Sequence, residues 1–314
     1  MELKTKNRTI YVFETKLYSL VSHETNDKEE NILEINWKPD IIEKIFNHII
    51  NLDKKERVQI KEGEWFFSLE NMKIDKKEIP GDEDCLYGWF EGVRLGLRTD
   101  LKSLSTLTTR ENPKKPDESE TQRTYFYFRL KDGLFLLDTY SGNVVTVRRL
   151  ENYLEEKAQP IFKKYNIRNI VFHHRINKGF LEELDKFDVI RLAKVRIKIQ
   201  DKNEYDTKDA IGYLKEISRR TYANYLDIVV GRRKAKKRGL IIPNLKEFLQ
   251  KLLENRQEIV SGIIEGSRSD GGPKTLKLDG IEEKHKEKFL VDEKGEVLPE
   301  HMFEFMIEMG NKKE

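Results

Sequence analysis

The sequence predicts an α+β fold of two domains, each built from a mostly antiparallel sheet with packed helices. Three observations lead to this prediction. Short runs rich in Ile, Val, Tyr and Phe recur between Gly, Pro and Asn residues, which is typical of strands. Stretches with apolar residues three and four positions apart lie between these runs and indicate amphipathic helices. The length of 314 residues suits two domains of ordinary size.

The first predicted domain covers residues 1–187. Its elements are expected in this order: a strand over 9–20, a helix from Pro39 to Leu52, strands starting at Trp65 and Cys85, a hairpin over 125–138, a passage from strand to helix over 144–165 that breaks near Pro160, a strand over 169–176 and a helix over 179–187. Residues 99–122 are rich in Ser, Thr, Pro and mixed charge, which predicts a long mobile loop. The hairpin turn over residues 131–133 contains a glycine, as tight turns between strands often do.

The second predicted domain covers residues 188–314. Its first strand, over 192–199, alternates apolar and cationic residues, which marks a half-buried strand. The elements expected after it are a helix over 206–218, a strand over 226–230, a helix over 243–253, strands over 258–265, 275–278 and 289–291, and a last helix over 298–309.

The composition indicates a folded chain with a heavily charged surface. Hydrophobic and charged residues each make up 37%, and aromatic residues make up 10%. Cys85 is the single cysteine, which excludes an intramolecular disulfide and a cysteine-based zinc site and suits a reducing compartment. No apolar run approaches the roughly 20 residues of a membrane helix. The polar start of the chain does not resemble a signal peptide, so a cytoplasmic location is expected.

Positive charge is concentrated in residues 219–238. Eight basic residues and one acid, Asp227, give this stretch a net charge of +7, and because the whole chain is +3 the remainder sums to −4. The basic residues are Arg219, Arg220, Arg232, Arg233, Lys234, Lys236, Lys237 and Arg238. Cations this close together repel one another, and folding alone does not require them. The stretch therefore predicts contact with nucleic-acid phosphates.

Other interpretations of this stretch remain open. Blocks of like charge are often solvated loops, and an anionic membrane or an acidic protein is a further partner class. Arg219 and Arg220 end a predicted helix, where cations interact favourably with the helix dipole, so these two have a structural explanation. The segment 232–238 lies between a predicted strand and a helix that starts at Pro243, which places it on a folded scaffold.

A metal-dependent nuclease is the main enzymatic alternative. Such an enzyme needs carboxylates and a lysine around a Mg²⁺ ion. Glu265 with Asp270, Lys274 and Lys277 is a loose match to this requirement. In a chain with 56 acidic and 59 basic residues such groupings arise by chance, so no catalytic or metal-binding residue is predicted.

Two further patterns favour structural roles. His173 and His174 are neighbours on a predicted strand and point to opposite faces, which predicts one packed and one exposed histidine and no shared metal. The aromatic run over residues 125–128 could offer a surface on which bases stack, but such a strand more often belongs to the core.

Several short motifs together resemble the RexA phage-exclusion family. Asp84, Gly88, Gly92 and Arg94 lie in a strand of the first half. In the second half, Leu-Asp-Ile-Val-Val at 226–230 precedes the basic segment, Gly-Ser-Arg-Ser-Asp-Gly follows at 266–271, and Glu-Lys-Gly at 293–295 precedes the last helix. The chain is also similar in length to the KwaB proteins of the Kiwa defence system.

Either resemblance implies dimeric, largely sequence-independent DNA binding in phage defence, with the basic residues of segment 232–238 as contacts. We therefore expect a non-enzymatic DNA-binding protein of an anti-phage defence or abortive-infection system, with no cofactor. The expected partners are duplex DNA, a second copy of the chain and a membrane or effector protein encoded nearby. The alternatives are a metal-dependent nuclease effector and a protein-interaction subunit of a multi-gene defence system.

Overall fold

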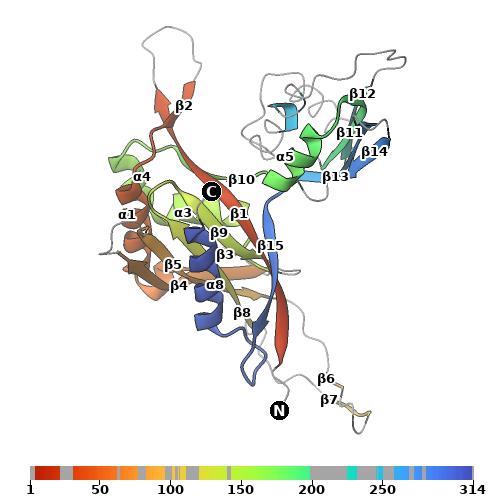
Figure 1. The fold of residues 1–314 in the computed structure, drawn as a ribbon. Helices are drawn as coiled ribbons and strands as arrows, with labels where there is room; N and C mark the ends of the chain where they lie inside the picture. Colours follow the sequence, from red (N-terminus) through yellow and green to blue (C-terminus); the bar gives the residue numbers. More distant parts are fainter. Residues whose placement is uncertain are drawn as a thin grey trace. The chain divides into compact units, whose positions relative to one another are not determined.

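The computed structural model divides into two compact units (Figure 1). The first unit comprises Met1–Phe172 and His285–Glu314, and the second comprises His173–Lys284. The structure describes residues 4–21, 31–61, 64–76, 83–95, 101–102, 105, 107–110, 120–139, 143–198, 225–231, 245, 247–249, 258–268, 272–277 and 281–312. Among these residues, no helix combines the length and the hydrophobicity that crossing a membrane requires.

A large, mostly antiparallel sheet forms the centre of the first unit. Within the described residues its strands are β1 (Thr5–Val21), β2 (Asn31–Ile35), β3 (Gln59–Lys61), β4 (Trp65–Asp75), β5 (Cys85–Arg94), β8 (Thr121–Arg129), β9 (Leu134–Thr139), β10 (Asn169–His174) and β15 (Lys284–Leu290). Their order is β10-β1-β9-β8-β5-β4-β3, and β2 and β15 also pair with β1. Two short strands, β6 (Leu101–Lys102) and β7 (Thr109–Arg110), pair inside the stretch that was expected to be a loop.

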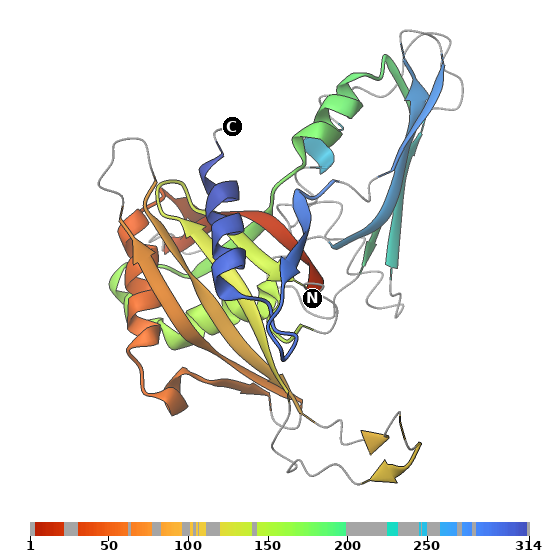
Figure 2. The same cartoon turned by 60° about the horizontal axis from the view of Figure 1, so that its bottom comes forward.

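Helices cover both faces of this sheet, because both faces carry apolar side chains. They are α1 (Pro39–Ile50), α2 (Lys54–Arg57), α3 (Val147–Lys157), α4 (Gln159–Lys164) and α8 (Pro299–Asn311). Side chains alternate along β1, so Phe13 joins the core under α1 and α3, and Ile10 joins the core under α8. Figure 2 shows α8, in dark blue, crossing one face of the sheet.

The strand β8 is buried on both faces. The aromatic run from Tyr125 to Phe128 has no solvent exposure at any of its four residues. Tyr125 and Tyr127 belong to the core under α8, and Phe126 and Phe128 to the core under α1. The prediction of a core strand is confirmed, and the idea of a base-stacking surface here is wrong. The predicted hairpin is also confirmed, since Arg129 of β8 pairs with Leu134 of β9 around Gly133, whose φ is +76°.

The second unit contains a four-stranded antiparallel sheet within its described part. Its strands are β11 (Val189–Lys198), β12 (Tyr225–Gly231), β13 (Glu258–Ser267) and β14 (Pro273–Lys277), in the order β12-β11-β13-β14. Phe180 and Leu184 of the helix α5 (Lys178–Asp185) share one apolar core with Val195 and Ile197 of β11. Of the helix predicted over 243–253, the described residues 245 and 247–249 are helical, and the helix predicted over 206–218 lies outside the described residues.

Residues from His285 onward belong to the first unit, whereas the sequence placed all of 188–314 in one domain. The physical reason is that β15 pairs with β1 and α8 packs on β8 and β9. The division also falls after Phe172 instead of near residue 187.

The strand expected at the start of the passage over 144–165 is not formed. Val144 and Val145 are buried and lead directly into α3, whose first turn is capped by the Thr146 hydroxyl accepting from the Arg149 N–H at 3.4 Å.

Candidate nucleic-acid interface

All eight basic residues predicted to contact nucleic acid lie outside the described residues. They are Arg219, Arg220, Arg232, Arg233, Lys234, Lys236, Lys237 and Arg238. The structure does describe β12, which occupies the middle of the basic stretch and contains its one acid, Asp227. The candidate interface is therefore built from β12 and the strands beside it.

The strand β12 lies at one edge of the four-stranded sheet in the described part of the second unit. It pairs with β11 without any register shift, from Leu192 opposite Gly231 to Lys198 opposite Tyr225. Its last residue, Gly231, directly precedes Arg232 in the chain. The basic segment 232–238 therefore starts at the end of a regular edge strand.

One face of this sheet packs on the core and the other faces solvent. Ala193, Val195 and Ile197 of β11 are buried, and the alternate residues Leu192, Lys194 and Arg196 point to the opposite side. We call this opposite side the outer face. The register places the following described residues on it: Leu192, Lys194, Arg196, Tyr225, Asp227, Val229, Ser261, Ile263, Glu265, Thr275 and Lys277.

A bidentate ion pair joins β11 to β12 on the outer face. Arg196 Nε donates to Asp227 Oδ1 at 2.7 Å, and Arg196 Nη2 donates to Asp227 Oδ2 at 2.8 Å. Lys194 Nζ lies 3.8 Å from the same carboxylate. The hydrogen bond from Arg196 lowers the pKa of the Asp227 carboxyl, and the pKa of Arg196 is raised for the same reason. The one acid of the basic stretch is therefore already occupied by cations of the neighbouring strand.

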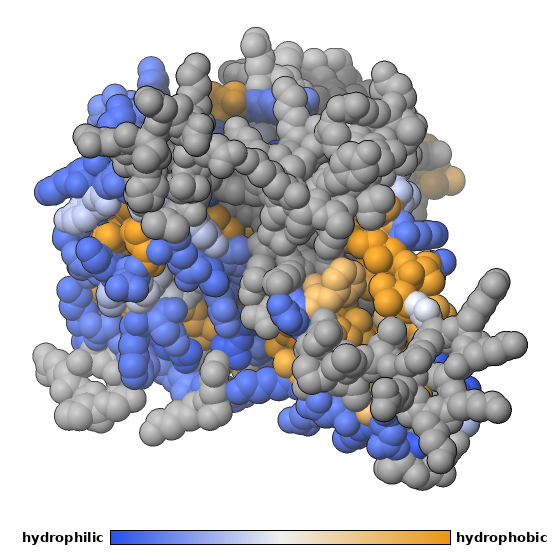
Figure 3. Space-filling view, turned by 90° about the horizontal axis from the view of Figure 1, so that it is seen from above, coloured by the Kyte–Doolittle hydropathy of each residue, from blue (hydrophilic) through white to orange (hydrophobic). Residues whose placement is uncertain are grey.

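Apolar side chains are also exposed on this sheet. The exposed fractions are 51% for Tyr225, 57% for Val229, 42% for Val230 and 36% for Ile263. The Arg196 guanidinium lies 5.9 Å from the centre of the Tyr225 ring, in cation–π range. Among the coloured residues of the face drawn in Figure 3, apolar groups in orange lie beside hydrophilic groups in blue. The outer face therefore offers both charged and apolar contacts to a partner.

Lys274 of the loose nuclease match lies on the opposite face of the sheet from Glu265 and Lys277. Glu265 pairs with Thr275 and points to the outer face, whereas Lys274 pairs with Gly266 and points to the other side. There Lys274 Nζ bonds the Glu183 carboxylate, which Arg268 Nη2 also contacts at 3.0 Å. Asp270 lies outside the described residues. The grouping of Glu265 with Lys274 is therefore wrong, and in the described part of the chain no three His, Cys, Asp or Glu side chains form a metal-binding cluster.

The two neighbouring histidines differ in exposure less than expected. His173 is 7% exposed, as predicted for the packed member. The His174 side chain is 31% exposed, and its Nε2 lies 3.7 Å from Glu282 Oε1. Burial lowers the pKa of His174, and the Glu282 carboxylate opposes that effect.

Sequence reasoning missed the ion pair between Arg196 and Asp227. The alternation of residues 192–199 did place Lys194 and Arg196 on one face. The partner of Arg196 depends on the register between two strands that lie about thirty residues apart, and no local pattern encodes it.

Comparison with models of protein families and with curated proteins finds no match to this sequence.

Proposed function

We propose that this chain is a non-enzymatic protein that binds the phosphate backbone of duplex DNA, largely independently of base sequence. The proposed contacts are the basic residues of segment 232–238, together with Arg219, Arg220 and the outer-face cation Lys194. The observation that carries the proposal is the engagement of Asp227 by Arg196. Because that acid is already paired, it does not neutralise the eight cations that surround it in sequence.

The proposed phosphate contacts predict that the affinity for DNA depends on the salt concentration. Lysine and arginine side chains that meet phosphates release condensed counterions, so binding weakens as salt is added. Contacts to phosphates carry no base information, which makes the binding tolerant of sequence. The scaffold supports the proposal because the basic segment follows the end of a regular strand that has no register shift.

Charge reversal tests the assignment of the surface. We expect the quadruple variant Arg232→Glu, Arg233→Glu, Lys236→Glu and Lys237→Glu to lose retention of duplex DNA at low salt while its unfolding transition stays unchanged. The matched control reverses four exposed lysines of the first unit: Lys54, Lys55, Lys163 and Lys294. Equal loss in both variants would point to net charge alone, and retained binding in the first variant would remove the basic segment from the interface.

A second copy of the chain is the protein partner we propose, with β12 as the contact. In the described part of the sheet β12 is an edge strand, and it exposes Tyr225, Val229 and Val230. Its one charged side chain, Asp227, is held by Arg196. Exposed edges of this kind pair readily with another strand. Pairing of two β12 strands would continue the sheet across the dimer and bring two basic segments to one assembly, which strengthens weak phosphate binding.

The cellular role we propose is cytoplasmic anti-phage defence or abortive infection, together with a membrane or effector protein encoded nearby. This part rests on the resemblance to the RexA and KwaB families. It is tested by the plating efficiency of phages on bacteria that express the chain or its quadruple charge-reversal variant. Protection that is equal in the two strains would separate defence from DNA binding, and no protection would remove the defence role.

We also propose that the two compact units are separate domains. Each has its own apolar core, one around Phe126 and the other around Val195. Because β15 and α8 belong to the first unit, a fragment that ends at residue 172 lacks part of its own sheet. Limited proteolysis should therefore release a fragment from the second unit and leave the two segments of the first unit associated. Simultaneous digestion of both units would contradict the division.

A further inference from the structure

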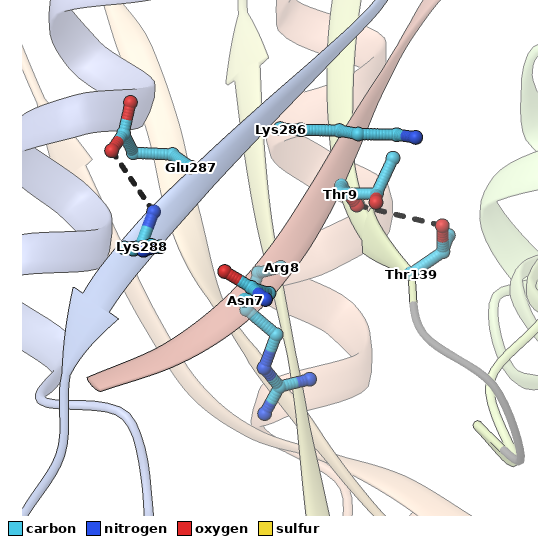
Figure 4. Close-up of a pocket in the computed structure, with 7 residues that line it drawn as sticks. All are labelled: Asn7, Arg8, Thr9, Thr139, Lys286, Glu287 and Lys288. Atoms are coloured by element: carbon cyan, nitrogen blue, oxygen red, sulfur yellow. Dashed lines mark hydrogen bonds between the residues drawn. The ribbon is translucent and has the colours of Figure 1, made fainter. Parts of the chain in front are cut away.

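A polar pocket lies in the first unit, where three strands meet. It has a volume of about 660 Å³ and is lined by Asn7, Arg8 and Thr9 of β1, Thr139 of β9, and Lys286, Glu287 and Lys288 of β15 (Figure 4). Backbone pairing fixes its walls, since Thr9 is the register partner of Thr139 and the Val291 N–H donates to the Lys4 carbonyl at 3.1 Å. The pocket belongs to a different unit from β12, so it does not depend on the proposed DNA interface.

Strand alternation sorts the lining residues onto two sides. Ile10 and Phe289 belong to the core under α8, so Asn7, Thr9, Lys286 and Lys288 point to the other side of the sheet. Thr139 lies with them, because it pairs directly with Thr9. Figure 4 shows Lys286 extending from β15 across β1 towards the two threonines. One side of the pocket therefore combines two ammonium groups, two hydroxyls and an amide.

The single acid in the lining points away from this side. Glu287 is the residue between Lys286 and Lys288, and its carboxylate accepts a hydrogen bond from the Lys288 backbone N–H at 2.9 Å. Figure 4 shows it on the other side of β15 from Lys286. In the described part of the chain, no carboxylate forms an ion pair with the ammonium group of Lys286 or Lys288. Within the described residues, the positive charge of the two lysines therefore faces the pocket without a carboxylate partner.

A buried cation forms part of the wall. Arg8 is 2% exposed. It lies on the same face of β1 as the apolar residues Ile10 and Val12, which belong to the core under α8. Its Nη1 lies 3.1 Å from Asp138 Oδ2, and Asp138 is fully buried. A buried ion pair can often be replaced by apolar side chains without loss of stability, so stability alone does not explain it. It does hold a guanidinium at a fixed place beside the pocket.

We propose that this pocket binds a small phosphorylated molecule of about nucleotide size, with Lys286 and Lys288 as the charged contacts. Phosphate groups present several acceptor oxygens and more than one negative charge. The side of the pocket that holds Lys286 and Lys288 presents two cations, an amide and hydroxyls, and none of its described lining residues carries a carboxylate. Thr9 and Asn7 can donate to further phosphate oxygens, whereas the Thr139 hydroxyl already donates to the Thr9 carbonyl at 3.5 Å. The volume lies within the range of about 300–1,000 Å³ that is usual for small-molecule sites.

Titration calorimetry with inorganic tripolyphosphate and with ATP tests the proposal on the full chain. We expect both to bind the wild type, and we expect the affinity to fall at least tenfold in Lys286→Glu with Lys288→Glu. The milder pair Lys286→Gln with Lys288→Gln should also weaken binding, which keeps the test valid if the charge reversal disturbs the fold. The matched control reverses Lys54 and Lys55, two exposed lysines of α2 in the same unit, and should change the affinity less than twofold.

A duplex oligonucleotide without terminal phosphates forms the third arm of the experiment and separates two sources of phosphate. If its binding falls with the pocket variants while tripolyphosphate does not bind, the lysines belong to a nucleic-acid surface and the small-ligand proposal is overturned. Absence of tripolyphosphate and ATP binding to the wild type, or equal weakening in the α2 control, overturns it as well. Because the pocket lysines lie outside segment 232–238, loss of DNA binding in the quadruple variant leaves the result of this test unaffected.

Discussion

Two guanidinium nitrogens of Arg196 in β11 donate hydrogen bonds to the carboxylate of Asp227 in β12, at 2.7 and 2.8 Å. The two residues are direct register partners, so the fork geometry follows from the pairing of the strands. Both side chains remain partly exposed, and solvent weakens their attraction. The importance of the pair lies in its position, because it occupies the one acid in a stretch of eight cations.

Removing this acid should strengthen DNA binding. In Asp227→Asn the stretch gains one unit of positive charge and Arg196 is released from its partner. We expect duplex DNA to bind about two- to fivefold tighter at low salt, with the difference fading at high salt because screening suppresses exposed charges. Fluorescence anisotropy over a salt series measures this. Unchanged or weaker binding would show that β12 lies away from the interface.

A charge at the edge of β12 should separate the two copies of a dimer. Val229 is 57% exposed, and lysine at an edge position opposes pairing between strands. We expect the molar mass from light scattering to fall from dimer to monomer in Val229→Lys. The control is Thr275→Lys, which places the same charge on the exposed face of β14 at the opposite edge. A monomeric wild type, or dissociation in the control alone, would contradict the proposed contact.

The packing of α8 on the sheet depends on Gly310. A Cβ atom at this position would lie 2.2 Å from Cε1 of Tyr127, and the Gly310 carbonyl accepts from Arg129 Nη1 at 2.5 Å. We expect Gly310→Ala to lower the free energy of unfolding by about 1–3 kcal/mol, since overpacking forces the helix away from β8. Urea unfolding measures the change. The control Glu304→Ala, at an exposed site of the same helix, should be nearly neutral, and equal effects would argue against the close contact.

The buried Asp138 should make stability depend on pH. Burial raises the pKa of its carboxyl to about 7, against the opposing effects of Arg8, the Tyr125 backbone N–H and Lys6. Because the folded pKa lies above the ordinary value of 3.8, the unfolded chain releases this proton first as pH rises. The contribution of Asp138 is therefore fully present below about pH 4 and is lost as pH rises to 7.

The size of this effect is bounded by the two pKa values. A difference of three units corresponds to at most about 4 kcal/mol, at roughly 1.4 kcal/mol per unit. Chemical unfolding between pH 4 and pH 7 should show wild-type stability falling relative to Asp138→Asn, which cannot titrate. Parallel pH profiles of the two proteins would contradict a raised pKa at this site.

Local patterns predicted the elements whose evidence lies within a few residues. The four-residue spacing of Ile41, Ile45 and Ile49 predicted α1, and the glycine turn at 133 predicted the β8–β9 hairpin. The alternation after Leu192 gave β11 and its two faces. Each of these signals is a period or a turn, which neighbouring residues determine by themselves.

Long-range pairing could not be predicted in this way. The strand β15 pairs with β1, at the opposite end of the chain, and this contact moves the last helix into the first unit. The alternating lysines at 284, 286 and 288 are a signal for a strand with a cationic face, but its start was predicted only at 289. The partners of Arg8 and Arg196 likewise depend on which strands meet, so the pocket and the outer face emerge only from the assembled sheets.

The salt dependence of duplex DNA binding tests the central claim most directly. If the six cations of segment 232–238 each meet a phosphate, they alone give a plot of log affinity against log salt concentration a slope of about −5, at roughly −0.9 for each contact, and contacts from Arg219, Arg220 and Lys194 would make the slope steeper. The quadruple charge-reversal variant should lose this binding at every salt concentration, and the four-lysine control should keep the slope. A slope near zero in the wild type, or the same slope in the quadruple variant, would contradict the proposal that this segment contacts DNA.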